Sequence, residues 1–274
     1  MSFFNVSPDA CVRCGICMAE CPNRLILMYK ETGLPKLRIQ GEEDCILCGH
    51  CVAVCPAKAL NLSPLPADGF IPLDKKLNIS FEQADQFLKS RRSIRAFKST
   101  LVSDENLDKI MDVARFAPTA SHRQYIRWIM VKDAAKSHRI AEMVIEWMTD
   151  VRKEKPEIAK RYRMAGLIAG WRKGYDMILR GAPHLAIAYT TQGSHWMALD
   201  ASIALTYIEL SAHSLGVGAC WAGFFTQAVA VYAPLREFLG LPQGSIVHGG
   251  QMLGYAKYNY PCLPWRKPLD LIWM

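Results

Sequence analysis

The sequence predicts an α+β protein built from two unlike parts, and three observations lead to this class. Eight of the ten cysteines lie within residues 1–62. Residues 63–80 hold three prolines and a glycine without sustained apolar periodicity, which is typical of a linker. Residues 81–274 carry several helical periodicities around a few apolar strand segments. A chain of 274 residues is long enough for a small and a medium domain, each with its own core.

Charge divides at the same boundary as the cysteines. Residues 1–62 contain six Lys and Arg against six Asp and Glu, so the formal net charge of +8 resides entirely in the remainder. The basic residues are scattered through apolar segments and form no strip with aromatic residues, which argues against nucleic-acid binding. The N-terminus lacks a basic segment followed by a long apolar one, so we expect no signal peptide. A reducing cytoplasm suits the cysteines.

The cysteines form an internal duplication. The segments "CVRCGICMAECP" at 11–22 and "CILCGHCVAVCP" at 45–56 place each cysteine 34 residues from its counterpart. Two copies that are rich in Cys, Gly and Pro cannot stack as a helical solenoid, although a period of this length occurs in such folds. The duplication therefore predicts two equivalent binding loops rather than a repeat array.

The spacing C-x2-C-x2-C-x3-C-P is typical of cubic iron-sulfur clusters. Three closely spaced thiolates wrap one cluster, and the fourth reaches the cluster of the other motif. We therefore assign one 4Fe-4S cluster to Cys11, Cys14, Cys17 and Cys55, and a second to Cys45, Cys48, Cys51 and Cys21. Gly15 and Gly49 lie where the backbone passes close to a cluster. Zinc prefers paired CxxC or Cys/His sets, and disulfides fit neither the spacing nor the compartment, so both are weaker alternatives.

Residues 5–62 resemble the bacterial two-cluster ferredoxins. The resemblance implies a ferredoxin-like fold of two pseudo-symmetric βαβ halves, and a role as a one-electron relay.

The elements of the larger domain follow in order along the chain. Ser80 and Ser103 are the expected caps of two helices, over about 81–90 and 104–117. Strands are expected at 126–132, 184–191 and 246–254, and the helices between and after them at about 135–152, 157–180, 196–214 and 227–239. This order is not a repeating βα alternation, so a doubly wound nucleotide-binding domain is not indicated. The uncharged stretch from Leu210 to Leu235 contains glycines and Pro234, which favours a buried helix end, a turn and a second helix over a membrane span.

Three segments of this domain carry candidate chemistry. "RRSIRAF" at 91–97 offers cationic donors for a phosphate, although an isolated cluster of this kind is more often a solvated turn. "APTASHRQ" at 117–124 places hydroxyl, imidazole and amide groups in one turn, which suits the edge of a planar heterocycle, although His122 taken alone is more often an ordinary loop histidine. "LGVGACWAGFF" at 215–225 lacks the dinucleotide fingerprint, and its small residues suit either a flat ligand or tight packing.

Taken together and in this order, the three segments resemble the FMN-dependent nitroreductase family over about residues 80–274. The resemblance implies an α+β domain with a central, mainly antiparallel sheet flanked by helices, and a homodimer with FMN at the subunit interface. It places the phosphate and ribityl chain near Arg91, Arg92, Ser93 and Arg95, and the flavin ring near His122 and Gln124. Backbone amides of Ala222 and Gly223 are implied near flavin N5, and Arg266 or Lys267 as a C-terminal phosphate ligand. His122 stands where the family has Asn.

These features predict a cytoplasmic oxidoreductase in which two 4Fe-4S clusters and FMN pass electrons between a one-electron carrier and a small organic substrate, such as a nitroaromatic or a quinone. The external donor is expected to be a ferredoxin, a flavodoxin or NAD(P)H. No catalytic side chain is assigned, because the sequence shows no nucleophile paired with a base. An electron-transfer subunit without a substrate of its own is the alternative, and a zinc-stapled binding module is a third hypothesis.

Overall fold

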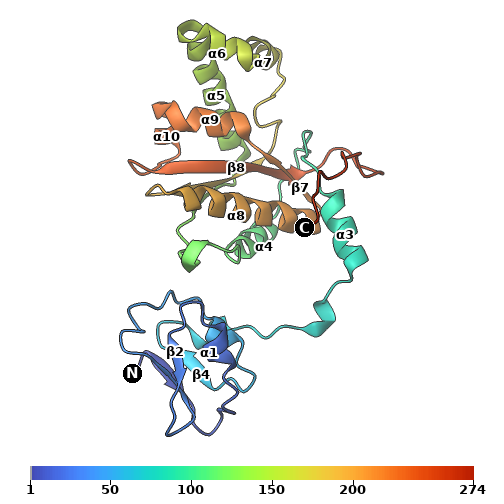
Figure 1. Cartoon of the computed structure of the whole chain (residues 1–274). Coiled ribbons are helices and arrows are strands. Elements are labelled where there is room, and N and C mark those ends of the chain that lie inside the picture. The colour runs from blue at the N-terminus through green and yellow to red at the C-terminus, as the bar shows by residue number, and fades with distance from the viewer. Residues whose placement is uncertain (1) are drawn as a thin grey trace. The chain divides into compact units, whose positions relative to one another are not determined.

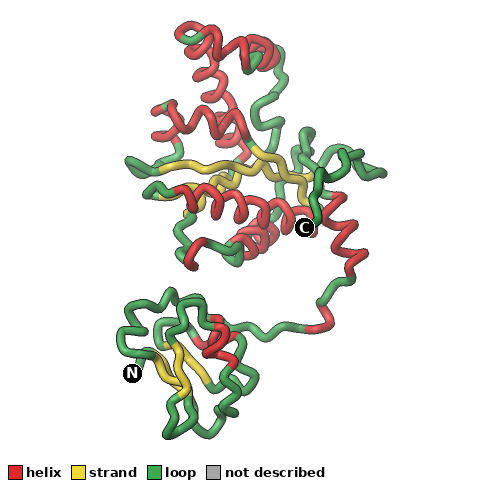
Figure 2. The backbone as a smooth tube through the Cα atoms, in the orientation of Figure 1, coloured by secondary structure: helices red, strands yellow, loops and turns green. Residues whose placement is uncertain are grey.

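The chain folds into two compact units, each described here by itself. The computed structural model describes residues 2–274. The first unit takes in the N-terminal residues as far as Asn78 together with the short segment Ser121–Arg123, and the second takes in Ile79–Ala120 and Gln124–Met274. Figure 1 shows the order of their helices and strands, and Figure 2 shows how much of the first unit is loop.

The first unit contains two βαβ halves, as its resemblance to the two-cluster ferredoxins implies. Its regular elements are β1 (Phe4–Val6), α1 (Ile16–Glu20), β2 (Ile26–Met28), β3 (Pro35–Leu37), α2 (His50–Ala53) and β4 (Leu60–Leu62). Strand β1 pairs antiparallel with β4, and β2 pairs antiparallel with β3, so each two-stranded ribbon joins the two halves. The short 3-10 turns η1 (Ala67–Gly69) and η2 (Lys75–Leu77) complete this unit.

The two glycines of the cysteine motifs occupy equivalent backbone positions. Gly15 precedes α1 with φ 72°, and Gly49 precedes α2 with φ 70°. Side chains other than that of glycine rarely adopt this left-handed conformation at low cost, so glycine permits the sharp turn from loop to helix. The turn directs the third cysteine of each motif back toward the other cysteines of its loop.

The second unit is a four-stranded antiparallel sheet covered by helices on both faces. Its strands are β5 (Arg127–Val131), β6 (His184–Thr190), β7 (Val217–Trp221) and β8 (Ile246–Tyr255), in the spatial order β5-β6-β8-β7. Its helices are α3 (Phe81–Ser90), α4 (Asp104–Ala114), α5 (Ala134–Glu154), α6 (Pro156–Arg161), α7 (Met164–Arg172), α8 (His195–Ser214), α9 (Gly223–Val231) and α10 (Ala233–Phe238), with a 3-10 turn η3 (Ala120–His122).

Two buried clusters of apolar side chains hold the layers together. Helices α4 and α8 pack on one face of the sheet, where Ile110, Leu205 and Leu253 are fully buried. Helices α5 and α9 pack on the other face, around Phe225 and Met148 (Figure 1). The α+β class with a mainly antiparallel central sheet is thereby confirmed.

The expected helix starts are present where the sequence places their caps. Ser80 Oγ accepts from the Gln83 amide while the Gln83 side chain accepts from the Ser80 amide, which forms a capping box at α3. Ser103 Oγ accepts from the Asn106 amide and caps α4. Both helices therefore begin at the predicted residues.

Three expectations about secondary structure were incomplete. Residues 217–221 form strand β7 at the sheet edge. Val217 and Ala219 are buried in the cluster between the sheet and α8, and Cys220 is buried in the cluster on the opposite face of the sheet. The helix expected at 157–180 ends at Arg172 after a break at Arg163, whose φ of 53° is left-handed. The helix expected at 227–239 begins at Gly223 and is interrupted at Tyr232, because Pro234 lacks the amide that would continue it.

No helix within residues 2–274 is both long enough and apolar enough to cross a membrane.

Candidate functional site

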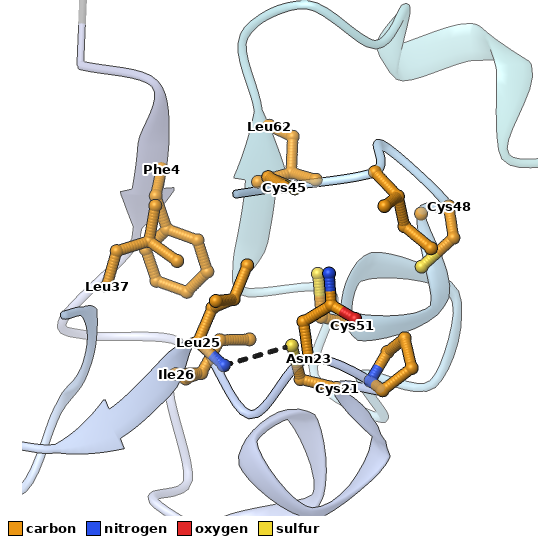
Figure 3. A pocket seen from close by; sticks show the side chains of 13 residues that line it. Phe4, Cys21, Asn23, Leu25, Ile26, Leu37, Cys45, Cys48, Cys51 and Leu62 are labelled. Carbon is orange, nitrogen blue, oxygen red and sulfur yellow. Dashed lines mark hydrogen bonds between the residues drawn. The ribbon is translucent and has the colours of Figure 1, made fainter. Parts of the chain in front are cut away.

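The eight N-terminal cysteines line two separate pockets, each with three cysteines from one motif and one from the other. Cys21 joins Cys45, Cys48 and Cys51 around one small pocket (Figure 3). Cys55 joins Cys11, Cys14 and Cys17 around the other. The crossed grouping that the spacing predicts is the one that the fold brings together.

Backbone amides point at the crossing cysteines. The amide of Leu25 donates to Cys21 Sγ at 3.3 Å, as the dashed line in Figure 3 marks, and the amide of Ala59 donates to Cys55 Sγ at 3.3 Å. These residues are equivalent in the duplication, since both pairs are 34 residues apart. Amide donors to sulfur stabilise thiolate ligands and tune the potential of a cluster.

The pockets disfavour free thiolates. Burial raises the pKa of Cys51 to about 12, and the neighbouring Cys48 and Cys45 add to the shift. Burial also raises the pKa values of Cys17 and Cys45. A bound metal cation makes four adjacent thiolates favourable there, so assembly of a cluster must displace the protons of these thiols.

The arginine segment is held against strand β7. Ser93 forms a parallel bridge with Ala219, and the amide of Ile94 donates to the Ala219 carbonyl at 2.9 Å. Gly218 makes this approach possible, since a Cβ atom there would lie 2.6 Å from Cγ1 of Ile94. The segment is therefore an added edge to the sheet and not a solvated turn.

Arg91 points inward to an acid of helix α8. Its Nη1 donates to Glu209 Oε1 at 2.6 Å, and the Glu209 side chain is 8% exposed. Both residues line an open pocket together with Arg92, His213 and Tyr260. Burial lowers the pKa of His213, and the cations Arg91 and Arg92 lower it further, so this imidazole is held neutral.

Arg92 has an unsatisfied hydrogen-bond donor and lies close to other cationic side chains, a setting that favours a bound anion. Its Nη atoms donate to the carbonyls of Lys89 and Arg91, but its buried Nε has no hydrogen-bond partner among the residues that the structure describes. Burial lowers the pKa of Arg92, and the nearby guanidinium groups of Arg266 and Arg91 lower it further. Three guanidinium groups with an unpaired donor fit a phosphate group, which would relieve their repulsion and accept the Nε hydrogen bond.

The loop at 117–124 is strained, and it is held by one bond to helix α8 and by another within the loop itself. Ser121, His122 and Gln124 have φ values of 51°, 54° and 49°, which is uncommon outside glycine. The amide of Ala120 donates to both carboxylate oxygens of Asp200, at 3.1 and 3.3 Å, and Asp200 is 8% exposed. The amide of Gln124 donates to Thr119 Oγ1 at 3.1 Å. Strain of this kind persists where the surrounding structure enforces it.

The backbone amides of Ala222 and Gly223, both candidates for a contact with flavin N5, differ in whether they already have a hydrogen-bond partner. The amide of Ala222 donates to the Gly250 carbonyl at 2.8 Å, so it already serves the sheet. Gly223 is the first residue of α9, where backbone amides lack partners within the helix, and a Cβ atom there would meet nothing within 4 Å. Of the two, Gly223 is the better placed donor.

Of the remaining candidate FMN ligands, Ser93 and Arg95 lie near Cys220, and Arg266 lies near Arg92. Burial raises the pKa of the Cys220 thiol, whereas Arg95 and Arg180 act in the opposite direction, and Ser93 is a hydrogen-bond partner of the thiol. Arg95 and Ser93 thus lie on the Cys220 side of the segment. Lys267 is exposed in the C-terminal tail, and only Arg266 of this pair is near Arg92.

Sequence reasoning missed Asp200 and Glu209, which hold the loop and the arginine segment. A signal was available, because they are the only acidic residues in the apolar stretch 195–214. A buried carboxylate without a partner is costly, so acids in such a helix indicate specific partners elsewhere in the fold.

Comparison with known protein families finds a match for each of the two parts of the chain. Residues 88–255, which are more than half of the chain, match the model of the nitroreductase family. The chain belongs to the nitroreductase family. Residues 10–59 match the model of a 4Fe-4S dicluster domain, so this nitroreductase carries a two-cluster ferredoxin domain at its N-terminal side.

Two archaeal relatives align with most of the nitroreductase part. A candidate NADH dehydrogenase/NAD(P)H nitroreductase of Archaeoglobus fulgidus is 27% identical over 176 residues, covering 64% of this chain and 87% of that protein. A protein of the same description from Methanothermobacter thermautotrophicus is 28% identical over 178 residues, covering 63% of this chain and 76% of that protein.

Solved structures share the fold. A nitroreductase with bound FMN from Bacteroides fragilis gives a TM-score of 0.59 at 21% identity, covering 70% of this chain and 98% of its own. A second, from Desulfitobacterium hafniense and also with bound FMN, gives a TM-score of 0.57 at 22% identity, covering 72% and 100%. The nitroreductase-like fold of residues 79–274 is thereby confirmed.

The crossed cysteine grouping makes a testable prediction about double variants. If Cys21 and Cys45 serve one cluster, Cys21→Ser and Cys21→Ser/Cys45→Ser should both retain about half of the wild-type iron, because both remove the same one of two equal clusters. Cys21→Ser/Cys17→Ser should retain almost none. Iron analysis of anaerobically purified protein checks this, and half of the iron remaining in Cys21→Ser/Cys17→Ser would contradict the grouping.

Proposed function

We propose that this protein is an FMN-dependent oxidoreductase in which the two 4Fe-4S clusters, bound by the eight N-terminal cysteines, connect an external one-electron carrier to FMN and an organic substrate. The convergence of Arg91, Arg92 and Arg266 around an unsatisfied donor carries this proposal. A phosphate-bearing cofactor fits that cluster, and the solved relatives from Bacteroides fragilis and Desulfitobacterium hafniense are nitroreductases with bound FMN.

Side chains around this cluster supply binding and orientation. Arg92 and Arg266 are the proposed phosphate ligands, and Arg91 adds charge while Glu209 fixes its position. Ser93 and Arg95 are proposed to contact the ribityl chain and ring, and the Gly223 amide to donate at flavin N5. His122 and Gln124, on the strained loop, are proposed to meet the polar edge of the ring.

Bound FMN would supply the exchange between one-electron and two-electron chemistry, which is the property that makes it a suitable neighbour for iron-sulfur clusters. The protein contributes the position of the cofactor, the cationic environment of its phosphate and donors along its ring. The substrate is proposed to be a small acceptor such as a nitroaromatic or a quinone. A ferredoxin, a flavodoxin or NAD(P)H is the proposed donor, and the Archaeoglobus fulgidus relative is named for NAD(P)H.

Turnover of the purified, cofactor-loaded protein tests this function. Reduced ferredoxin, reduced viologen, NADH and NADPH are each offered with a panel of nitroaromatics and quinones under anaerobic conditions. We expect at least one one-electron donor to support reduction of an acceptor faster than free FMN does. The matched control is the Cys21→Ser/Cys17→Ser variant, in which the rate with one-electron donors should fall more than tenfold if the clusters carry the current.

Two results would contradict the proposal. If no acceptor is reduced faster than by free FMN, the protein is an electron-transfer subunit of a larger complex. If the protein is colourless and contains zinc without iron or flavin, it is a binding module outside redox chemistry.

We propose that the protein acts as a homodimer through helix α8. This helix is rich in apolar residues, and Trp196, Leu199 and Ile203 on it are 60%, 45% and 38% exposed. A helix of this composition is normally buried all round. We call Trp196, Leu199 and Ile203 the exposed stripe of α8. A second copy of the chain would cover this stripe symmetrically and close the proposed flavin site, which α8 helps to form.

Substitution within the stripe tests the dimer. Ile203→Glu places a charge at the centre of the proposed interface, so we expect a monomer in light scattering at micromolar concentration where the wild type is a dimer. Ile158→Glu, which adds the same charge at a 43% exposed isoleucine of helix α6 outside the stripe, is the matched control. A dimeric Ile203→Glu variant would contradict this interface.

Substitution of Asp200 is expected to change the affinity of the protein for FMN. Asp200→Ala removes the acceptor that holds the Ala120 amide, so the strained loop should relax and FMN should bind about tenfold more weakly, consistent with loss of a buried hydrogen bond to a charged group. Asp200→Asn keeps an acceptor oxygen and should bind nearly as tightly as wild type. Titration of flavin-free protein, followed by flavin fluorescence, measures this. Unchanged affinity in Asp200→Ala would exclude a positioning role.

A further inference from the structure

The two cluster pockets are equivalent in their ligands but not in their surroundings. We call residues 11–17 the first cluster loop and residues 45–51 the second cluster loop. The duplication gives both loops three cysteines and a glycine at the same positions. The crossing cysteines Cys21 and Cys55 each accept one backbone amide at 3.3 Å. A difference between the two clusters must therefore come from the other residues of the first unit.

The second cluster loop is more deeply buried than the first. Cys48 is half-buried, whereas its counterpart Cys14 is exposed. Gly49 is buried, whereas its counterpart Gly15 is half-buried. Each glycine lines the pocket of its own loop, so the second pocket has a buried wall where the first has a wall that water reaches.

Two apolar side chains cover the second cluster loop. A Cβ atom on Gly49 would lie 3.1 Å from Cε1 of Phe70 and 3.5 Å from Cδ1 of Leu65, so both side chains lie directly against the backbone of the loop. A Cβ atom on Gly15 would meet nothing within 4 Å. Phe70 and Leu65 come after β4, the last strand of the two βαβ halves, and the first cluster loop has no such cover.

The residues that carry this cover are folded back onto the first unit. Residues 63–70 belong to the stretch whose composition indicates a linker, and we call them the cover segment. The amide of Ser63 donates to the carbonyl of Phe3 at 2.9 Å, which extends the pairing of β1 with β4. The amide of Gly69 donates to the carbonyl of Pro66 at 3.1 Å and closes the turn η1. The cover segment is thus part of the ferredoxin fold and not a free connection.

Cover of this kind changes the reduction potential of a cluster. A 4Fe-4S cluster with four thiolate ligands is an anion, and an electron that it accepts adds a negative charge. Surroundings from which water is excluded disfavour the more highly charged state. A covered cluster is therefore harder to reduce than an otherwise equivalent cluster beside water, and its iron is less accessible to solutes.

The charged side chains beside the two loops do not reverse this order. All of them are exposed, so water and salt screen their effect on the clusters. Asp9 and Arg13, at the first loop, have opposite signs, and Glu20 of α1 pairs with His50 of α2 at 3.4 Å. Three acids precede the second loop and act in the same direction as burial, namely Glu42, Glu43 and Asp44.

We propose that the cover segment, through Phe70 and Leu65, makes the two clusters inequivalent. The covered cluster, held by the second cluster loop and Cys21, has the lower reduction potential and releases its iron more slowly. The open cluster, held by the first cluster loop and Cys55, takes the first electron that enters the pair. One electron from the reductant reduces one cluster, and no bond is made or broken. Phe70 is a positioning residue, since it acts on the cluster through Gly49. This difference between the clusters goes beyond the proposed function, because it is independent of the substrate and of the electron carrier.

Variants that keep one cluster isolate the effect of the cover. Cys17→Ser leaves the covered cluster and Cys51→Ser leaves the open cluster, and Phe70→Ala is introduced into each. In potentiometric titrations followed by EPR, we expect Phe70→Ala to favour reduction of the covered cluster about tenfold, a rise of about 59 mV, and to leave the open cluster unchanged. Phe70→Leu keeps an apolar cover and should restore most of the wild-type potential. Ile71→Ala alters a 73% exposed side chain next to Phe70 and is the matched control.

Iron release from the protein with both clusters keeps the inference testable if the single-cluster variants load poorly. With an excess of a ferrous chelator, wild type should release its iron in two phases of about equal size, the second about tenfold slower than the first. The slow phase should approach the fast one in Phe70→Ala and should persist in Phe70→Leu and Ile71→Ala.

The outcomes separate the two parts of the proposal. A single phase of iron release in wild type, or a covered cluster with the higher potential, would overturn the inequivalence of the clusters. A covered cluster that keeps its potential and its release rate in Phe70→Ala, or equal shifts of both clusters in that variant, would overturn the role of the cover segment.

Discussion

Helix α8 is the element on which the proposed flavin site depends, because two buried carboxylates on it hold two segments that are distant in sequence. Asp200 binds the Ala120 amide of the strained loop, and Glu209 binds the guanidinium group of Arg91. Nine residues of helix separate the two acids by about 13 Å. Since the helix packs on the sheet, the spacing between the loop and the arginine segment is fixed by a rigid element and not by either segment itself.

The same helix links the cofactor site to assembly. One side of α8 buries Leu205 and Ile208 against the sheet, and the opposite side exposes Trp196, Leu199 and Ile203. In the proposed dimer, the helix that positions the flavin segments of one subunit would also be packed by the partner. The ferredoxin unit is built on a different principle, because its two pockets are each lined by four cysteines, and burial raises the pKa values of Cys17, Cys45 and Cys51, so that a bound metal would have to displace their protons.

Spacing and capping made much of the fold predictable. The interval of 34 residues and the fourth cysteine before proline predicted the crossed pockets, and Ser80 and Ser103 predicted two helix starts. Strand β7 was missed because its glycine and alanine are weak strand formers, and its edge position depends on a bridge to Ser93 that no local pattern shows. The breaks at Arg163 and Tyr232 were missed because apolar periodicity continues across them.

The candidate site was less predictable than the fold. Residue types suggested the arginine segment, but they did not reveal that Arg91 is paired with Glu209, or that the amide of Ala222 already serves β8. Such contacts depend on tertiary packing between residues 28 to 118 positions apart. Stopped-flow mixing of the loaded protein with a one-electron reductant tests the central claim most directly, with cluster and flavin absorbance followed separately. The account predicts that the clusters are reduced before the flavin and that flavin reduction slows sharply without them; flavin reduction that precedes the clusters, or is unaffected by their loss, would contradict it.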